Sequence, residues 1–301
     1  MHRAALIYNP RSGRQRHGEV LEGIVGTLQE GGFLVELCPT AYAGQATELA
    51  RGFAAEGRAD AVFAFGGDGT AREVAAGLLG TQVALGVLPG GTANLLAMAL
   101  GLPRDPVQAA KVLRDAPVRS FDVGMTRGEA GEHPFLMMTS TGLDATVLAA
   151  LDVELKWRFG EAAILWQGIR EWWRYSYPDI EVIADGERLH ATFAAVANIP
   201  FYAGSFRLAP GASPDSHHLE LVLFRGRGRR ATLGFILDLM RSAHVRRRDV
   251  EVRRVDEVLF AGPAGTAAQI DGDLCEERLP VRIRLAPERL RVLFPIPKGT
   301  S

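Results

Sequence analysis

The pentapeptide Gly66-Gly67-Asp68-Gly69-Thr70 has the residue types and the spacing to handle a phosphate group. Its glycines let the backbone approach a bulky anion closely, and the helical pattern that follows offers free N–H groups in its first turn. Asp68 adds an acid or base beside these donors. The combination predicts a turn for phosphoryl transfer. A tight turn or hairpin is the alternative interpretation, because Asp-Gly is a common turn dipeptide.

Two other loops of similar character also follow apolar, strand-like runs. The segment Asn9–Arg14 follows Ala4–Tyr8, and Pro89–Thr92 follows Val83–Leu88, just as the Gly66 turn follows a third run. In a parallel sheet the carboxyl ends of the strands meet at one edge, where ligands of open α/β sheets bind. The residues that we expect to converge on one phosphate-bearing ligand are Asn9, Ser12, Gly67, Asp68, Gly69, Thr70, Gly91, Thr92 and Asn94.

Several familiar nucleotide and metal motifs can be excluded. Arg72 stands where a dinucleotide fingerprint needs its third glycine, and neither Gly-x-x-x-x-Gly-Lys-Ser/Thr nor the His-Arg-Asp of protein kinases occurs. His217 and His218 form the only close histidine pair, and no His-Glu-x-x-His or Cys-x-x-Cys accompanies them. A zinc site is therefore not expected.

A regular alternation of strand and helix patterns in the first 124 residues must position these loops. The expected strands are Ala4–Tyr8, Phe33–Leu37, Ala61–Phe65 and Val83–Leu88. The expected helices are Val20–Leu28, Ala46–Ala55, Ala71–Leu79 and Ala93–Leu100. This alternation predicts a parallel, doubly wound sheet.

Beyond residue 124 the pattern becomes mostly β, and this change of period alone sets the domain boundary. The expected strands are Phe135–Thr139, Ile180–Ala184, Leu189–Val196, Leu219–Phe224 and Val281–Leu285. Asp185-Gly186 separates two of these runs at the spacing of a two-residue hairpin, which indicates antiparallel pairing. The segment Asp144–Tyr175 is the exception and predicts one or two amphipathic helices.

All four tryptophans lie in this helical segment, which has two interpretations. The rings can fill the core of the second half. Alternatively, they can form a lip that admits an acyl chain or touches the bilayer interface, where tryptophan is favoured.

The composition is that of a soluble globular protein: 301 residues, 47% hydrophobic and 23% charged, with a net charge of −1. This charge gives no reason to expect nucleic acid as a partner. A local arginine cluster fits a solvated face or a contact with an anionic membrane; it comprises Arg225, Arg227, Arg229, Arg230, Arg241, Arg246, Arg247 and Arg248. Two cysteines, no apolar signal segment and no apolar run of about eighteen residues predict a cytoplasmic protein without a membrane span.

The three loops, in this order and spacing, resemble those of lipid kinases with the diacylglycerol kinase catalytic domain, a family that includes bacterial diacylglycerol kinases and sphingosine kinases. The resemblance covers nearly the whole chain. Segments similar to later blocks of the family are Ser120–Gly124, Gly142–Asp144, Asn198 with Tyr202–Gly204, and Asp271–Asp273.

The resemblance implies an α/β nucleotide-binding domain at 1–124, which the C-terminal residues 286–301 rejoin through Leu290–Phe294, and a mostly antiparallel lipid-binding β-sandwich domain at 125–285. ATP and Mg²⁺ are expected in the interdomain cleft, with diacylglycerol or a related long-chain lipid alcohol as acceptor. The chain is then expected to act peripherally at the inner membrane face, and a homodimer is compatible with the resemblance. The alternatives are an NAD kinase-like enzyme, because that group shares the Gly-Gly-Asp-Gly turn, and a nucleotide- or lipid-binding protein that has lost catalysis.

The resemblance also implies roles for single residues. It assigns the nucleotide to Asn9, Ser12, Arg14 or Arg16, Gly66, Gly67, Gly69, Thr70, Gly91, Thr92, Asn94 and Asp273. Asp68 and Asp122 are expected near the active-site Mg²⁺. Asp271 and Asp68 are the two candidates for the base that takes the proton of the acceptor hydroxyl. Asp271-Gly272 can also be read as a hairpin turn after Ala267–Ile270.

The chain departs from the family pattern at three places. Leu95 replaces an aspartate that many members carry, and Asp273 stands where glutamate is usual. Asp215 and the carbonyl of Leu219 match part of a structural Mg²⁺ site. Ser216 and His217, however, replace the second aspartate and the glycine of that site, so its ligand set is incomplete.

Overall fold

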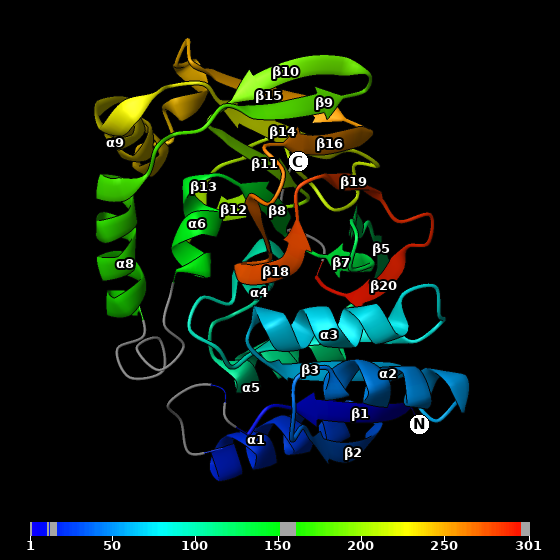
Figure 1. Cartoon of the computed structure of the whole chain (residues 1–301). Helices are drawn as coiled ribbons and strands as arrows, with labels where there is room; N and C mark the ends of the chain where they lie inside the picture. Colours follow the sequence, from blue (N-terminus) through cyan, green and yellow to red (C-terminus); the bar gives the residue numbers. More distant parts are fainter. Residues whose placement is uncertain (1, 11, 13–16, 151–160, 296–301) are drawn as a thin grey trace, which may run out of the picture. The chain divides into compact units, whose positions relative to one another are not determined.

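The computed structural model describes residues 2–10, 12, 17–150 and 161–295 of the chain (Figure 1). Contacts divide the chain into two compact units. The first comprises Met1–Val123 and Pro287–Ser301, and the second comprises Gly124–Ala286. The C-terminal strand therefore belongs to the same unit as the N-terminal one.

The first unit is built on a six-stranded sheet with the order β2-β1-β3-β4-β20-β5. Its strands are β1 (His2–Tyr8), β2 (Phe33–Pro39), β3 (Ala61–Gly66), β4 (Ala84–Pro89), β5 (Val118–Phe121) and β20 (Leu290–Leu293). Neighbours pair in parallel except β5, which runs antiparallel to β20. Every residue of β3 and β4 is buried, as expected for strands that are covered on both faces. The predicted doubly wound sheet is confirmed.

Five helices connect these strands: α1 (His17–Glu30), α2 (Gln45–Ala55), α3 (Asp68–Leu78), α4 (Leu95–Ala99) and α5 (Pro106–Arg114). Helix α1 packs against α5 and helix α2 packs against α3. Because parallel crossovers are right-handed and the chain reverses direction across the sheet after β2, these pairs cover opposite faces. Helix α3 begins three residues before the predicted start at Ala71, and α4 begins two residues after the predicted start at Ala93.

The second unit contains two antiparallel six-stranded sheets, with the orders β10-β9-β16-β19-β6-β7 and β15-β14-β11-β8-β17-β18. The strands of the first are β6 (Gly124–Arg127), β7 (Glu132–Phe135), β9 (Ile180–Ala184), β10 (Glu187–Ala191), β16 (Glu257–Gly262) and β19 (Val281–Leu285). Those of the second are β8 (Met138–Thr141), β11 (Phe193–Ala197), β14 (Leu219–Phe224), β15 (Val250–Val255), β17 (Ala267–Ile270) and β18 (Asp273–Arg278). A short pair, β12 (Phe201–Tyr202) and β13 (Phe206–Arg207), completes the set.

The core of the second unit lies on both faces of the sheet that contains β14. Leu221 and Leu223 of β14 join one buried apolar cluster with Val258 and Phe260 of the other sheet. The alternate residues of β14 join a second cluster with Phe235 of helix α9 (Gly228–Met240). Strand β14 is apolar on both faces except at Glu220, as expected for a strand that is covered on both sides.

The predicted strands Leu189–Val196 and Phe135–Thr139 are wrong as single strands. The first is divided at Thr192 into β10 and β11, which belong to different sheets. The hydroxyl of Thr192 donates to the carbonyls of Phe224 and Gly226, which fixes this corner. The second run is divided in the same way between β7 and β8. A continuous apolar run does not reveal where a chain changes sheet.

The predicted hairpin turn at Asp185-Gly186 is confirmed. Ala184 pairs with Glu187, and the two central residues have φ values of 48° and 85°. Positive φ at both positions is the conformation that favours Asp-Gly in a two-residue hairpin.

Helices α6 (Leu143–Ala149) and α8 (Glu161–Arg174) confirm the helical prediction for the described part of Asp144–Tyr175. Residues 151–160 lie outside the described residues. The core interpretation is wrong for Trp166 and Trp173, whose exposed fractions are 68% and 60%. Over residues 2–10, 12, 17–150 and 161–295, no helix is long and apolar enough to cross a membrane.

Candidate active site

Three loops leave one edge of the first unit's sheet together. Tyr8 of β1 pairs with Phe65 of β3, and Phe65 pairs with Leu88 of β4, so the three strands end in register. The amide of Asn9 donates to the carbonyl of Phe65 over 3.2 Å, and the amide of Gly90 donates to that of Gly66 over 2.8 Å. The loops predicted from the sequence therefore lie side by side at the carboxyl ends of parallel strands.

The glycines of the two glycine-rich loops are required by close packing of the loops. A Cβ atom on Gly91 would lie 2.6 Å from the Cα of Gly67, and one on Gly90 would lie 2.8 Å from the Phe65 ring. Neither glycine has a positive φ, so backbone strain is not the reason for its presence. With these glycines the two loops can present backbone N–H groups as one surface.

Asp68 joins the two glycine-rich loops through its carboxylate. It is the first residue of α3, and its two carboxylate oxygens accept from the amides of Leu95 at 3.1 Å and Leu96 at 3.0 Å. These amides are the first of α4, so Asp68 caps a helix that begins in the other loop. Leu95, which replaces a family aspartate, thus contacts Asp68 through its backbone.

Asn94 shapes the second glycine-rich loop. Its Oδ1 accepts from the amide of Gly91 at 2.9 Å, and its Nδ2 donates to the carbonyl of Gly91 at 2.8 Å. Asn94 has a φ of 51°, a left-handed conformation that asparagine tolerates better than most residues. Thr92 lies exposed at the tip of the loop. Asn94, predicted to bind the nucleotide, thus also holds the loop that carries Thr92.

The first loop is held by hydrogen bonds close in sequence. Both the amide and the hydroxyl of Ser12 donate to the carbonyl of Asn9, at 3.1 Å and 2.9 Å. Arg14 and Arg16 lie outside the described residues. In the pentapeptide, Gly69 and Thr70 occupy the first turn of α3, and the Thr70 side chain packs against Gly66.

Asp122 is almost fully buried and forms an ion pair with Arg289. Its Oδ1 lies 2.8 Å from the Nε of Arg289, and Asp122 keeps only 4% of its surface exposed. The pairing of Phe121 with Leu290 between β5 and β20 brings these two charges together. Asp122 is thus held by Arg289, and its expected place near the active-site Mg²⁺ stays a prediction.

Asp271 occupies a two-residue turn between β17 and β18 in the second unit. Ile270 pairs with Asp273, and Asp271 and Gly272 have φ values of 51° and 85°. Its carboxylate accepts from three consecutive amides, those of Leu136 and Met137 at 2.9 Å and that of Met138 at 3.0 Å.

These three donors stabilise negative charge on Asp271 and fix the direction of its carboxylate. The predicted hairpin turn at this position is confirmed. Asp273, which the resemblance assigned to the nucleotide, begins β18 directly after the turn.

The residues of the structural Mg²⁺ site do not fit a metal. Asp215 is exposed and accepts from the Ser213 hydroxyl, while Leu219 starts β14 and pairs with Val255. The neighbouring Glu220 accepts from the amide of Gly211 at 2.9 Å, and burial raises the pKa of its carboxyl. Within the part of the chain that the structure describes, no three His, Cys, Asp or Glu side chains cluster as a metal site would require.

Two families match the chain, one in each half. The family described as diacylglycerol kinase catalytic domain matches residues 3–126, and the YegS C-terminal NAD kinase beta sandwich-like domain matches residues 137–294. A Chromohalobacter salexigens protein named "probable lipid kinase YegS-like" is 32% identical over 90% of this chain and 86% of its own length. This chain belongs to the diacylglycerol kinase family of lipid kinases.

Other members of the family align with this lipid kinase over nearly its full length. A diacylglycerol kinase of Mycobacterium tuberculosis is 28% identical over 97% of this chain and 95% of its own. Two Bacillus anthracis crystal structures under diacylglycerol kinase titles share the fold, with TM-scores of 0.81 and 0.72 at 22% and 20% identity. They cover 97% of this chain and 95% and 97% of their own.

The sequence points to Asp68, Asp122 and Asp271 as candidate site residues of this lipid kinase but not to most of the side chains around them. Arg289 gave no local signal, because only the pairing of β5 with β20 brings it to Asp122. Gln269, which is 2% exposed, gave a weak one. A polar side chain within an apolar strand is either paired or functional.

Proposed function

We propose that this lipid kinase transfers the γ-phosphate of ATP, with Mg²⁺, to a hydroxyl group of a membrane lipid, diacylglycerol or a related long-chain alcohol. The family supplies the reaction class. The contact between Gly67 and Gly91, with Asp68 joining both loops, is the observation that carries the proposal. It creates a backbone surface at the end of a parallel sheet, where phosphates of bound nucleotides lie.

The reaction forms one bond and breaks one. The lipid hydroxyl oxygen bonds to the γ-phosphorus, the bond from that phosphorus to the β,γ-bridging oxygen breaks, and ADP leaves. When bound with ATP, Mg²⁺ supplies neutralisation of phosphate charge. Among the described carboxylates of the first unit, Asp68 fits a role beside the metal, because it lies half-buried at the loops that would hold the phosphates.

We assign the hydroxyl proton to Asp271 and not to Asp68. Asp68 lies at the loops that would hold the phosphates, and we assign it a place beside the metal. Three amides hold the carboxylate of Asp271 in one direction, and a base must be held in this way to meet a hydroxyl.

Transfer of label from radioactive ATP tests the proposed reaction, with diacylglycerol, a long-chain amino alcohol and NAD as separate acceptors in detergent micelles with Mg²⁺. We expect a labelled lipid on thin-layer plates. Label on NAD alone would assign the chain to the NAD kinase-like alternative. ATP binding without transfer to any acceptor would support a protein that has lost catalysis.

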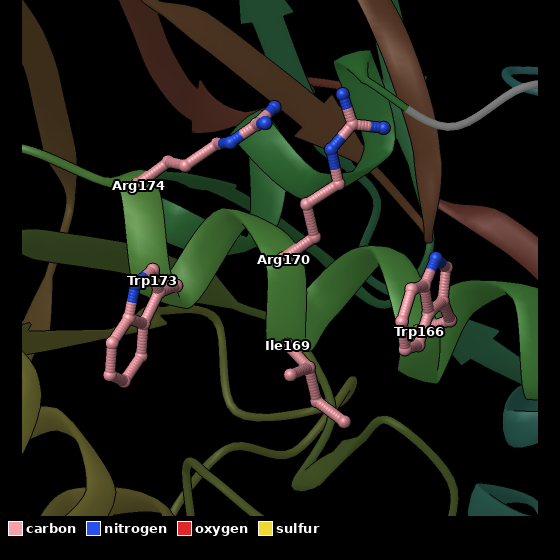
Figure 2. Close-up of a pocket in the computed structure, with 5 residues that line it drawn as sticks. All are labelled: Trp166, Ile169, Arg170, Trp173 and Arg174. Carbon is pink, nitrogen blue, oxygen red and sulfur yellow. The ribbon is translucent and has the colours of Figure 1, made fainter.

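The lipid substrate requires contact with a membrane, and we propose that helix α8 provides it. Trp166, Ile169 and Trp173 form an exposed apolar stripe on α8, with exposed fractions of 68%, 53% and 60%. Figure 2 shows Ile169 and Trp173 directed to one side of the helix and Arg170 and Arg174 to the other. Tryptophan beside arginine is typical of a helix that lies in an anionic bilayer interface.

Helix α9 extends this apolar surface. The guanidinium of Arg229 lies 4.2 Å from the centre of the Trp173 ring and donates to the Trp173 carbonyl at 2.6 Å, which fixes the end of α8 against the start of α9. Exposed apolar residues also line α9 at helical spacing: Leu233, Ile236, Leu237 and Met240. The proposed partner is an anionic lipid surface on the cytoplasmic side of a membrane. A homodimer stays a prediction, which light scattering of the purified chain can check.

A further inference from the structure

A chain of buried polar side chains links strands β8 and β17. Ser140 and Gln269 face each other across these strands and are 0% and 2% exposed. The Nε2 of Gln269 donates to the Oγ of Ser140 over 2.7 Å, and Ser140 donates to the Oδ2 of Asp144 over 2.5 Å. Asp144 lies in the first turn of α6.

The other end of the chain reaches the Asp271 turn. The amide of Gly272, the second residue of that turn, donates to the Oε1 of Gln269 over 2.8 Å. Every donor from Gly272 to Asp144 therefore points toward the carboxylate of Asp144. Hydrogen bonds that run in one direction polarise each other, and a negative charge at the accepting end strengthens the whole chain.

The surroundings of Asp144 show that its carboxyl is a shared acceptor. It also accepts from the amide of Ala145 at 2.7 Å and from the hydroxyl of Tyr202 at 3.4 Å. Burial raises the pKa of Asp144, and its hydrogen bonds oppose that rise. Burial and the nearby Asp144 also raise the pKa values of Tyr202 and Tyr175, so both phenols keep their protons, and Tyr202 donates a hydrogen bond to Asp144.

The turn itself does not need this chain of hydrogen bonds in order to form. Asp185-Gly186 adopts nearly the same conformation, with φ values of 48° and 85° against 51° and 85° for Asp271-Gly272. Asp-Gly alone is sufficient for such a turn. A buried path of two side chains between Gly272 and Asp144 must therefore serve the exact placement of the turn and not its formation.

We propose that Asp144 is a positioning residue, which acts through Ser140 and Gln269 to hold the Asp271-Gly272 turn in its catalytic position. The proposal rests on the proposed function, in which Asp271 takes the hydroxyl proton. Ser140 and Gln269 do not need to touch the substrate for this role.

Steady-state kinetics of Asp144→Ala and Ser140→Ala test the proposal, with Thr141→Val as the matched control. Thr141 is a neighbouring buried hydroxyl on β8 whose bond, at 2.9 Å, goes to the carbonyl of Ala267, outside the chain. We expect kcat to fall about 10- to 100-fold in both test variants, the usual cost of losing an outer-shell contact, with KM for ATP unchanged. The double variant should be no slower than the slower single variant.

Asp144→Asn keeps an acceptor for Ser140, so its kcat should fall less than that of Asp144→Ala. The asparagine variant also keeps the test possible if the alanine variant does not fold. Wild-type kcat in both Asp144→Asn and Ser140→Ala would overturn the proposal. If the losses of kcat were additive in the double variant, Asp144 and Ser140 would have separate roles, and this result would overturn the proposal as well.

Amide exchange at Gly272 gives a readout that does not depend on activity. Gln269→Leu removes the acceptor of this amide and should raise its exchange rate about tenfold, the factor that corresponds to one lost hydrogen bond. Ser140→Ala removes the contact that holds Gln269 and should raise the rate by a smaller factor, while Thr141→Val should leave it unchanged. Unchanged exchange in both test variants would overturn the proposal. Faster exchange in a chain that phosphorylates no lipid would leave the positioning role intact and refute the proposed function alone.

Discussion

Two carboxylates of the candidate site in this lipid kinase are held by backbone amides. Asp68 accepts two amides at the start of α4, and Asp271 accepts three at and just before the start of β8. Such amides are part of the fold. Each carboxylate is therefore placed before substrate arrives, which reduces the cost of reaching the reactive geometry.

Asp122 differs, because a cation compensates its charge. Replacing Arg289 by alanine should destabilise the protein by about 2–3 kcal/mol, since the 4% exposed carboxylate loses its ion pair with Arg289. The loss is smaller than for a fully buried pair because about a third of the Arg289 side chain, 32%, is exposed. Urea unfolding curves measure it.

Arg291→Ala is the matched control for this prediction. Arg291 lies two residues further along and its side chain donates to the exposed Gln82 at 3.2 Å, so its loss should cost less than about 0.5 kcal/mol. Equal urea unfolding midpoints for Arg289→Ala and Arg291→Ala would show that the ion pair between Asp122 and Arg289 does not contribute to stability.

At this scale the sequence points to the candidate residues, but not to the groups that hold them. Asp68 and Asp271 stand out because each begins an Asp-Gly pair beside an apolar run. The amides that hold Asp271 lie 133 to 135 positions away in the chain, and no local pattern encodes such a distance.

At the scale of elements, the site depends on two loops packed backbone to backbone. Gly91→Ala would place a methyl group 2.6 Å from the Cα of Gly67, so one loop must move. Overpacking of this kind costs about 1–3 kcal/mol, and we expect ATP to bind about tenfold more weakly. Titration with ATP checks this value.

Gly26→Ala provides the control for the loop prediction. A Cβ at Gly26, within α1, would meet nothing within 4 Å. Alanine is favoured over glycine in a helix by about 1 kcal/mol, so this variant should be slightly more stable and bind ATP normally. If Gly91→Ala binds ATP as tightly as Gly26→Ala does, the two loops do not form the nucleotide surface.

The elements of the first unit were more predictable than those of the second. Strands β1, β3 and β4 are each followed by a loop and a helix, and this order alone specifies a parallel sheet. In the second unit Thr192 divides one apolar run between two sheets, and only the tertiary structure determines where a run breaks. Strands β15 and β16 were also missed.

For the molecule as a whole, catalysis on a lipid requires a surface that finds the membrane. Trp166→Ala combined with Trp173→Ala should reduce binding to vesicles of phosphatidylglycerol at least tenfold, because two exposed rings leave the proposed interface. Arg170→Gln with Arg174→Gln should reduce binding to these vesicles and leave the weaker binding to phosphatidylcholine unchanged. Sedimentation of the protein with vesicles measures both.

Leu34→Ala with Leu37→Ala removes two apolar side chains of similar exposure, 51% and 47%, from β2 of the first unit. Vesicle binding should remain normal in this control. A loss of vesicle binding equal to that of the tryptophan variant would show that binding depends on general surface hydrophobicity and not on a docking helix. Activity on a short-chain, water-soluble acceptor should persist in both variants, which separates docking from chemistry.

We propose that this chain phosphorylates a lipid hydroxyl with Asp271 as the base. The most direct test of this proposal is transfer of labelled phosphate to diacylglycerol by Asp271→Asn, beside the wild type and Asp185→Asn. Asp185 lies in the same kind of turn, and its carboxylate also accepts two backbone amides, those of Asp256 and Glu257. We predict a loss of turnover of about 10²- to 10⁴-fold in Asp271→Asn with ATP binding retained, and normal turnover in Asp185→Asn. Equal turnover in the two variants would contradict the account.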